Sequence, residues 1–165
     1  MKKCIVAGIL VFNRDGKKVL LVKHKKLGVW IYPGGHIEEN ENPLECAIRE
    51  TNEETGIAVK VISSLSIAID ANSAKSLPQP LIIMEEDVPY EDAHHEHFDV
   101  IYLGIAGNTK LTKNEESLDC RWFDKNDIHN IETYENVKEI IKYGFDTFAI
   151  INKRTERTGK NVKMK

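Results

Sequence analysis

Residues 42–56 carry signals for both ends of a helix, and the rest of the chain can be placed around it. Asn42 is a favourable N-cap, Pro43 suits the first helical position, and Glu45 completes a capping box with Asn42. Gly56 supplies the stop at the C-terminal end. The sequence therefore predicts a helix over residues 43–55.

Apolar, β-branched segments on both sides of this helix predict a sheet. Residues 4–12 and 18–23 flank turn residues at 13–17 and predict a β-hairpin, and Trp30–Tyr32 predicts a third strand. We also expect strands at about 57–70, 81–85, 98–106 and 119–123, loops at 71–80, 87–96 and 107–117, and a second helix at about 134–152. This irregular order predicts an α/β (α+β) fold with a mixed sheet between helices.

Charge is distributed unevenly along the 165 residues. Residues 153–165 carry a balance of +5 and are expected to form a basic, flexible tail, whereas residues 1–152 carry −8 and are expected to form one domain. An acidic body argues against a general nucleic-acid binder. No apolar run approaches the length needed to cross a membrane, so no membrane association is expected.

The three cysteines, Cys4, Cys46 and Cys120, lie far apart and form no CxxC pair. This pattern indicates neither a disulfide framework nor a zinc cluster. It suits a reducing compartment, and the expected location is the cytoplasm.

Glutamates are concentrated in and just before the first helix, with seven of them in residues 38–54. On a helical wheel, Glu50, Glu53 and Glu54 share one face, apart from a predicted buried stripe of Leu44, Ala47, Ile48, Thr51 and Thr55. Carboxylates grouped in the last turns of a helix repel one another and oppose the helix dipole. A divalent cation with oxygen ligands would relieve that repulsion. A solvated acidic helix face is the alternative reading.

The residues before this helix suit a phosphate ligand. Pro33-Gly34-Gly35 allows a backbone to approach a ligand closely. Lys23 begins a basic segment, residues 23–26, that could meet phosphate, although an ordinary exposed strand end is an equally good interpretation.

The spacing of these residues resembles the Nudix box. Gly35, Glu41, Arg49-Glu50, Glu53-Glu54 and Gly56-Ile57 stand at the family's intervals over 23 residues. Thr51 departs from the pattern, because the family usually has an apolar residue there. Since the wheel places Thr51 on the buried stripe, we expect a tolerated core substitution that leaves the acidic face intact.

The resemblance implies the Nudix fold, an α/β/α sandwich, and hydrolysis of a nucleoside diphosphate linked to another group with Mg²⁺ or Mn²⁺. It implies that Glu50, Glu53, Glu54 and the Gly34 carbonyl hold metal, and that Arg49 and Glu41 orient the glutamates. Family members take the general base either from the box or from a downstream loop, so Glu53 or Glu50 and Glu115 or Glu116 are the candidates. The expected substrate-binding residues are Lys23, Gly35, Trp30 and Tyr32, and Tyr102 and Phe98 are further candidates for base recognition.

A histidine-rich segment, residues 94–99, suggests zinc at first sight. Strand alternation would place His95, His97 and Asp99 on one face, but it leaves no further ligand pair at a usual spacing. A polar row at a sheet edge or a strand that contacts substrate is the preferred interpretation.

The leading hypothesis is a magnesium-dependent pyrophosphohydrolase of a nucleoside triphosphate, oxidised or not, with a small nucleotide as its partner. The alternatives are a non-catalytic Nudix domain that senses a nucleotide and a hydrolase of ADP-ribose or dinucleoside polyphosphates. A homodimer is a further possibility. The fold is shared with prenyl diphosphate isomerases, but the position of Cys4 does not fit the catalytic cysteine of those enzymes.

Overall fold

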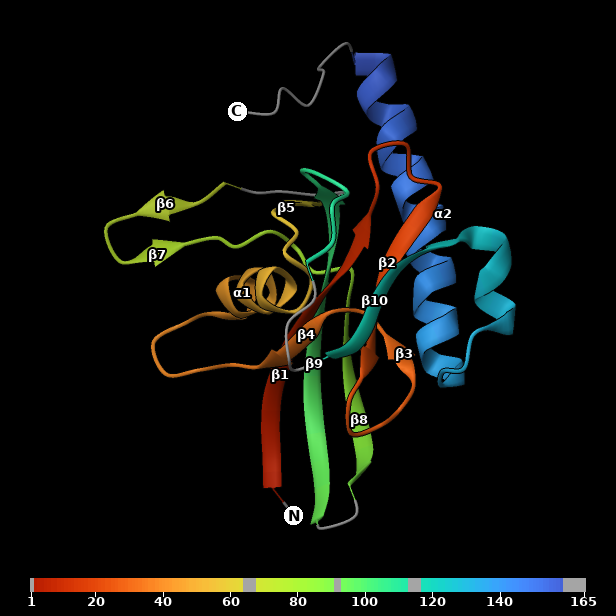
Figure 1. Ribbon diagram of the computed structural model, residues 1–165. Coiled ribbons are helices and arrows are strands. Elements are labelled where there is room, and N and C mark those ends of the chain that lie inside the picture. The colour runs from red at the N-terminus through yellow and green to blue at the C-terminus, as the bar shows by residue number, and fades with distance from the viewer. Residues whose placement is uncertain (1, 64–67, 91–92, 113–116, 159–165) are drawn as a thin grey trace.

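The central feature of the computed structural model is a large mixed sheet (Figure 1), and residues 2–63, 68–90, 93–112 and 117–158 are described. Within these residues, eight strands form one sheet: β1 (Lys2–Phe12), β2 (Lys18–His24), β3 (Trp30–Ile31), β4 (Gly34–His36), β5 (Val59–Ile62), β8 (Ile82–Tyr90), β9 (Ala93–Ala106) and β10 (Ser117–Asp124). The remaining elements are α1 (Pro43–Thr55), the small hairpin β6 (Asp70–Ala71) and β7 (Ala74–Lys75), the 3₁₀ helix η1 (Lys125–Asn130) and α2 (Glu135–Thr158).

The strand order is β10-β2-β1-β9-β5, and β3, β4 and β8 pair with β2, β1 and β9 respectively. β1 and β9 run parallel over eleven residue pairs, from Lys2 opposite His95 to Phe12 opposite Ile105. Every other pairing in this sheet is antiparallel. The predicted mixed sheet is therefore confirmed, and so is the hairpin of β1 and β2.

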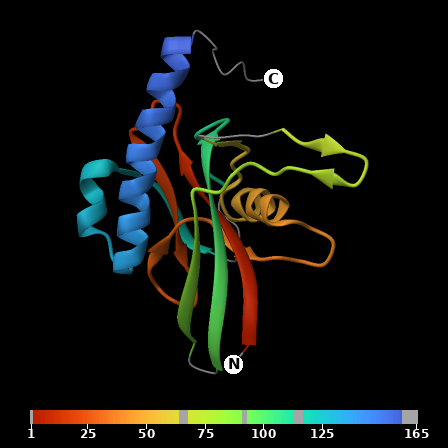
Figure 2. The same ribbon diagram turned by 180° about the vertical axis from the view of Figure 1, so that it is seen from behind.

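The sheet lies between α1 and α2, which cover opposite faces (Figures 1 and 2). Alternation along β1 explains this arrangement, because successive side chains point to opposite faces. Leu10 and Phe12 pack in the cluster that contains the apolar residues of α2. Ala7 and Ile9 pack in the cluster that contains Cys46 and Ala47 of α1.

The ends of α1 are those that the sequence predicts. The Asn42 side chain accepts hydrogen bonds from the backbone of Leu44 and Glu45, and the Glu45 side chain completes the capping box. Gly56 closes the helix with φ 69°, in the left-handed region that glycine adopts without strain.

One position of the predicted buried stripe of α1 is wrong. Ile48 is 38% exposed, and Cys46 is fully buried instead. The reason is β4, a strand that the sequence analysis does not predict. β4 pairs with β1 beside the helix, and the Cys46 thiol donates to the carbonyls of Gly35 and His36 at its end.

Several predicted boundaries also differ from the structure. The strand expected at 57–70 is only Val59–Ile62, with 64–67 outside the described residues, and the expected loop at 71–80 contains part of the β6–β7 hairpin. The loop expected at 87–96 is wrong, because β8 and β9 continue through most of it as an antiparallel pair. Its charged composition is typical of a loop, yet Glu96 lies in the strand and pairs with Lys3 at 2.7 Å.

The C-terminal helix is longer than expected. α2 ends at Thr158, so the predicted helix end at about residue 152 is wrong; residues 159–165 lie outside the described residues, and the flexibility of the tail stays a prediction. Basic residues at the C-terminal end of a helix interact favourably with its dipole, which explains the extension. Within the described ranges, no helix is long and apolar enough to cross a membrane.

Candidate active site

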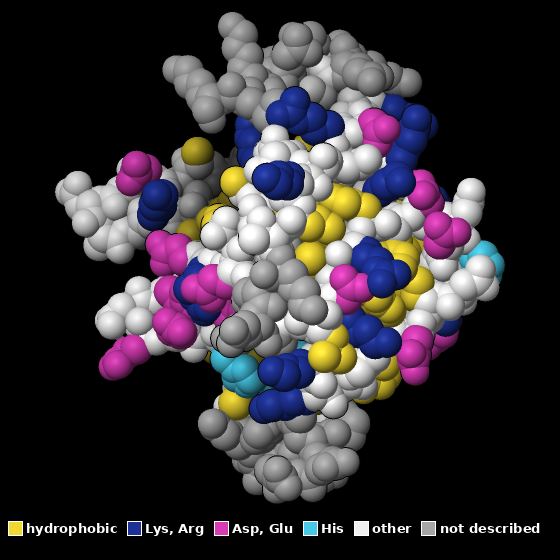
Figure 3. Space-filling view, viewed as in Figure 1, with side chains coloured by type: hydrophobic (Ala, Val, Ile, Leu, Met, Phe, Trp, Pro, Cys, Tyr) yellow, Lys and Arg dark blue, Asp and Glu magenta, His cyan; other side chains and the backbone are white. Residues whose placement is uncertain are grey.

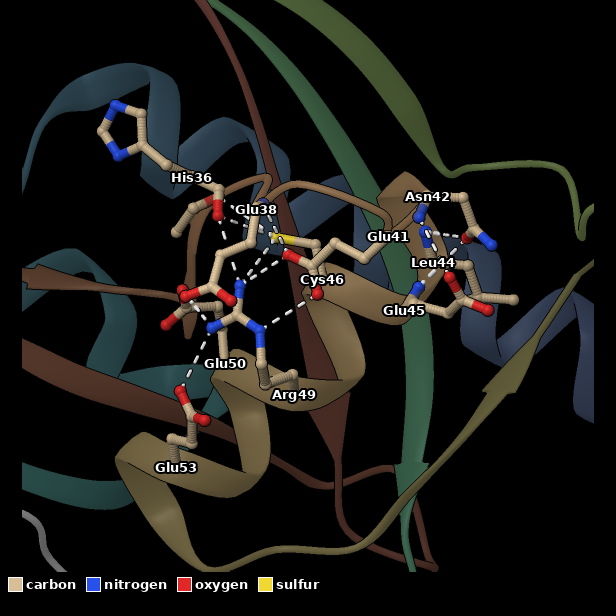
Figure 4. A network of polar contacts seen from close by, with 11 residues as sticks. His36, Glu38, Glu41, Asn42, Leu44, Glu45, Cys46, Arg49, Glu50 and Glu53 are labelled. Atoms are coloured by element: carbon tan, nitrogen blue, oxygen red, sulfur yellow. Dashed lines mark hydrogen bonds and ion pairs between the residues drawn. The ribbon is translucent and has the colours of Figure 1, made fainter.

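Arg49 is the centre of a network of glutamates on α1 and the loop before it (Figure 4). Its guanidinium donates two hydrogen bonds to Glu41, from Nε at 3.0 Å and from Nη2 at 2.6 Å. The remaining terminal nitrogen, Nη1, donates to Glu50 at 2.8 Å and to Glu53 at 3.1 Å. One cation therefore ties three of the predicted site glutamates together.

Glu41 is held from both sides. Besides the fork of Arg49, its Oε1 accepts the backbone N–H of Glu38 at 2.8 Å. The hydrogen bonds from Arg49 and from this backbone lower the pKa of the Glu41 carboxyl to about 2. Glu41 is therefore charged at neutral pH, and its hydrogen bonds raise the pKa of Arg49 in return.

The two glycines of β4 bring the backbone against the acidic helix. A Cβ at Gly35 would lie 2.3 Å from Oε1 of Glu50, so only glycine leaves room for that carboxylate. The N–H of Gly34 donates to Oε2 of Glu54 at 3.1 Å, and Glu54 is only 7% exposed. Figure 3 shows the acidic side chains gathered over α1 and the loop before it, with basic side chains among them.

Thr51 is a core residue, as the sequence predicts. It is fully buried, and its hydroxyl donates to the Ala47 carbonyl at 2.7 Å within the helix. The hydroxyl is satisfied inside the helix, so the departure from the apolar residue expected there leaves no unpaired polar group.

The carboxylates of α1 suit Mg²⁺ or Mn²⁺ by chemistry, because these ions prefer oxygen ligands. Glu54 is held at the β4 backbone by Gly34, Glu50 lies against Gly35 and is held by Arg49, and Glu53 lies one turn after Glu50 on the helix. Among the described residues, however, no three His, Cys, Asp or Glu side chains are gathered closely enough to hold a metal ion. Binding would therefore require glutamate side chains to turn toward the ion and to exchange contacts with Arg49.

A cavity of about 380 Å³ opens beside Gly34 and Gly35. Its walls come from β1, β4, β8 and β9, from the segment around β3 and from the start of α2. The polar side chains that line it are His24, Tyr32, His36, Glu86, Asp87, His97, Asp99, Tyr134 and Asn136. Neither lysine nor arginine is among the lining residues that the structure describes.

Asp99 and Tyr32 form the most buried polar pair of this cavity. The Tyr32 hydroxyl donates to Oδ2 of Asp99 at 2.5 Å, and Asp99 is 5% exposed. Burial raises the pKa of the Asp99 carboxyl to about 7; the hydrogen bond from Tyr32 lowers it and the charge of Glu86 raises it further. Burial also raises the pKa of Tyr32, so its proton stays on the hydroxyl.

The structure brings some of the predicted substrate-binding residues to the cavity and not others. Tyr32 and Gly35 line it. Trp30 does not, because it packs edge to face on Phe123 in the core, and Lys23 lies 3.9 Å from Glu132. Tyr102 is also a core residue, whereas Phe98 is 38% exposed.

The histidine-rich strand gives a mixed outcome. His97 and Asp99 are both buried and both line the cavity, as alternation predicts. β9 is not a sheet edge, because it pairs with β1 on one side and with β8 on the other. The proposed loop bases, Glu115 and Glu116, lie outside the described residues.

Sequence reasoning missed Glu86 and Asn136. The amide of Asn136 donates to Oε1 of Glu86 at 2.9 Å, which joins α2 to β8 at the cavity wall. Neither residue belongs to a motif, and β8 was expected to end before Glu86. Period-two alternation continued along β8 could have placed Glu86 on the same face as Met84, although not its position opposite His97.

Comparison with known proteins is consistent with this geometry. A family model described as "NUDIX domain" matches residues 2–143. A probable DHNTP pyrophosphohydrolase of Lactococcus lactis is 35% identical over 101 residues, which cover 59% of this chain and 51% of that protein. RNA pyrophosphohydrolase of Bartonella tribocorum is 41% identical over 70 residues, covering 37% of this chain and 39% of the relative. The chain thus matches about half or less of the length of these relatives.

Solved structures give the same picture of the fold. A NUDIX-family hydrolase from Clostridium perfringens superposes with a TM-score of 0.74 at 28% identity, covering 90% of this chain and 99% of that one. An Ap4A hydrolase of C. elegans superposes with a TM-score of 0.65 at 18% identity, covering 89% and 98% respectively.

Proposed function

The chain belongs to the Nudix family, and from this premise we propose that it is a pyrophosphohydrolase that uses Mg²⁺, or Mn²⁺, to cleave a nucleoside triphosphate or a related diphosphate-linked nucleotide. The observation that carries the proposal is the network of Arg49 with Glu41, Glu50 and Glu53, placed beside a cavity large enough for a nucleotide ring.

The glutamates of α1 are the proposed metal ligands. Glu50, Glu53 and Glu54 would supply carboxylate oxygens, and the Gly34 carbonyl is a further candidate. A bound divalent cation supplies two things in this chemistry: it neutralises charge on the pyrophosphate and it acidifies a water molecule. The absence of lysine and arginine from the described cavity wall favours placing the phosphates at the glutamates and the ring in the cavity.

Arg49 and Glu41 are proposed as positioning residues. Arg49 spans Glu41, Glu50 and Glu53, so its guanidinium fixes where the two helix carboxylates stand relative to β4. Glu41 in turn fixes the plane of the guanidinium through two hydrogen bonds. This arrangement limits the rotamers of Glu50 and Glu53 before any ligand arrives.

The general base is proposed to be Glu53 or Glu50, with Glu116 and Glu115 as the loop alternatives. Glu53 is the more accessible of the two box candidates, with a side chain that is 50% exposed against 15% for Glu50. A group that takes a proton from water must be reachable by that water, which favours Glu53 within the box.

The names of relatives support a substrate with a pyrophosphate bond. One relative is named as a probable DHNTP pyrophosphohydrolase and another as an RNA pyrophosphohydrolase. A small-molecule nucleotide is therefore the proposed partner. The described cysteines form no disulfide, in keeping with the proposed cytoplasmic location, and a homodimer stays a prediction.

Hydrolysis of a panel of triphosphates, ADP-ribose and dinucleoside polyphosphates with Mg²⁺ tests the proposal. We expect release of pyrophosphate or phosphate, and we expect Glu53→Gln to lower kcat about 10²–10⁴-fold if Glu53 is the base. Glu139→Gln, an exposed change on α2 across the sheet from α1, is the matched control and should leave the rate unchanged.

A second readout separates metal binding from proton transfer. Mn²⁺ binding followed by electron paramagnetic resonance should weaken in Glu50→Gln and Glu54→Gln, whatever the rate of turnover. The absence of turnover across the whole panel, together with unaltered Mn²⁺ binding in both variants, would refute the proposed function.

A further inference from the structure

The cavity beside β4 has polar chemistry that the proposed function does not use. Three carboxyl residues line it, Asp99, Glu86 and Asp87, and the first two project from neighbouring strands. Met84 lies opposite Asp99 and Glu86 lies opposite His97, so both carboxyl groups stand on the same face of the β8–β9 pair. Because the described wall includes neither lysine nor arginine, the site disfavours an anion and favours a ligand with N–H groups.

Asp99 is only half satisfied by the protein. Oδ2 accepts the Tyr32 hydroxyl, but Oδ1 is buried without a hydrogen-bond partner among the residues that the structure describes. Buried polar atoms are almost always paired, and leaving one unpaired is costly. A carboxyl group that is 95% buried, fixed on one side and unpaired on the other is suited to a ligand that donates.

Three further polar groups of the cavity are oriented by the protein. The Tyr32 proton is committed to Asp99, and the Asn136 amide donates to Glu86. His24 Nδ1 accepts the backbone N–H of Leu27 at 3.1 Å, so the ring proton of neutral His24 is on Nε2. The cavity therefore offers acceptors at Asp99 and Glu86 and a donor at His24.

We infer that this cavity selects a substrate ring with a 2-amino-4-oxopyrimidine edge, and that Asp99 is the specificity residue, its Oδ1 accepting a ring N–H. This edge presents a ring N–H beside an exocyclic amine, a pair of donors that matches a carboxylate, and an oxo group that matches a donor. Guanine and pterins carry it. Adenine presents a ring nitrogen acceptor beside its amine, which would meet the carboxylate of Asp99 unfavourably.

This inference rests on the proposed function, because the proposed function is what makes the substrate a phosphorylated compound. Its test measures binding and does not require hydrolysis. Binding of GMP, IMP, AMP and neopterin monophosphate is measured by calorimetry without metal at pH 8, above the pKa of about 7 of the Asp99 carboxyl, where Oδ1 is an acceptor. We expect GMP or neopterin monophosphate to bind at least about tenfold more tightly than AMP, with IMP, which lacks the 2-amino group, in between. The ratio of the dissociation constants of GMP and neopterin monophosphate shows whether the cavity prefers guanine or a pterin.

Variants assign the selectivity to Asp99. Asp99→Asn should reduce the preference for the 2-amino-4-oxo ligand over AMP at least about tenfold, because a neutral amide has both a donor and an acceptor and can pair with either ring. Asp146→Asn, an exposed change on α2 that removes an ion pair with Lys125, should change neither affinity. If Asp99→Asn does not fold, Tyr32→Phe removes the hydroxyl that fixes Oδ2 and should lower the same selectivity.

The outcomes separate the two proposals. Selective binding without turnover of any member of the substrate panel, and with Mn²⁺ binding unaltered in Glu50→Gln and Glu54→Gln, would sustain the inference and overturn the proposed function. Equal affinity for GMP and AMP, no binding of either 2-amino-4-oxo ligand, or an equal effect of Asp99→Asn on all ligands would overturn the inference, even if the enzyme hydrolyses triphosphates.

Discussion

Replacing Asp99 by Asn is expected to make the free protein more stable than the wild type at pH 8 but not at pH 5. Burial raises the pKa of the Asp99 carboxyl from 3.8 to about 7, against the opposing effect of the Tyr32 hydrogen bond. The folded protein therefore keeps a proton between these two values that the unfolded chain has released. Stability conferred by this proton is complete at low pH and is lost as the pH rises to about 7.

The size of this stability change follows from the pH range between the two pKa values. From pH 5 to about pH 7 the folded state holds about one proton more than the unfolded chain. Over this range the free energy of unfolding therefore falls by about 1.4 kcal/mol per pH unit. The wild type should lose about 3 kcal/mol from this group by pH 8. The amide that replaces the carboxyl in the Asp99→Asn variant carries no titrating proton. The lowered pKa values of Glu41 and His24 affect wild type and variant alike, so they cancel in the difference.

Urea unfolding followed by tryptophan fluorescence at pH 5, 6, 7 and 8 measures this difference. The free energy of unfolding of Asp99→Asn minus that of the wild type should grow by about 3 kcal/mol from pH 5 to pH 8. Asp146→Asn should follow the wild type throughout. A difference that stays constant with pH would mean that Asp99 ionises at its ordinary pKa in the folded protein, and would refute the reasoning.

Three further changes test the helix and its network. Gly35→Ala should lower kcat at least about tenfold and change the free energy of unfolding by less than about 1 kcal/mol, because the added Cβ displaces only the flexible end of Glu50. A loss of stability large enough to explain the inactivity would contradict this. Arg49→Lys should lower activity about 10–100-fold, measured as kcat/KM, because an ammonium cannot reproduce the fork to Glu41; unchanged kcat/KM would contradict this. Asn42→Ala should lower the urea-derived free energy of unfolding by about 1 kcal/mol through loss of the N-cap, and an Asn42→Ser variant should restore most of it.

The acidic helix could be predicted because its determinants are local. The N-cap, the capping box and the Gly56 stop all lie within residues 42–56. The spacing of the glutamates within one helix fixes their relative directions. The contact of Gly35 with Glu50 could not be predicted, because it depends on β4, a strand of three residues without a strand-like composition.

The cavity could not be predicted from the sequence, for a different reason. Tyr32 and Asp99 are separated by 67 positions in the chain, and Glu86 meets Asn136 across 50. Period and spacing describe one element at a time, whereas these contacts depend on how β3, β8, β9 and α2 meet. Alternation placed His97 and Asp99 on one face correctly, but it could not say that the face looks into a cavity.

The parallel pairing of β1 with β9 has a consequence for how the chain is made. Lys2 is opposite His95 and Phe12 is opposite Ile105, so the first strand has to wait for residues about ninety positions later before its long edge is covered. During synthesis on a ribosome, β1 can pair early only with β2 and β4, and Ile9 and Leu10 stay exposed for several seconds at ordinary elongation rates. A nascent chain stalled before β9 should therefore bind hydrophobic-specific chaperones, and one stalled only after α2 has also emerged should not, because α2 covers the face of the sheet that carries Leu10.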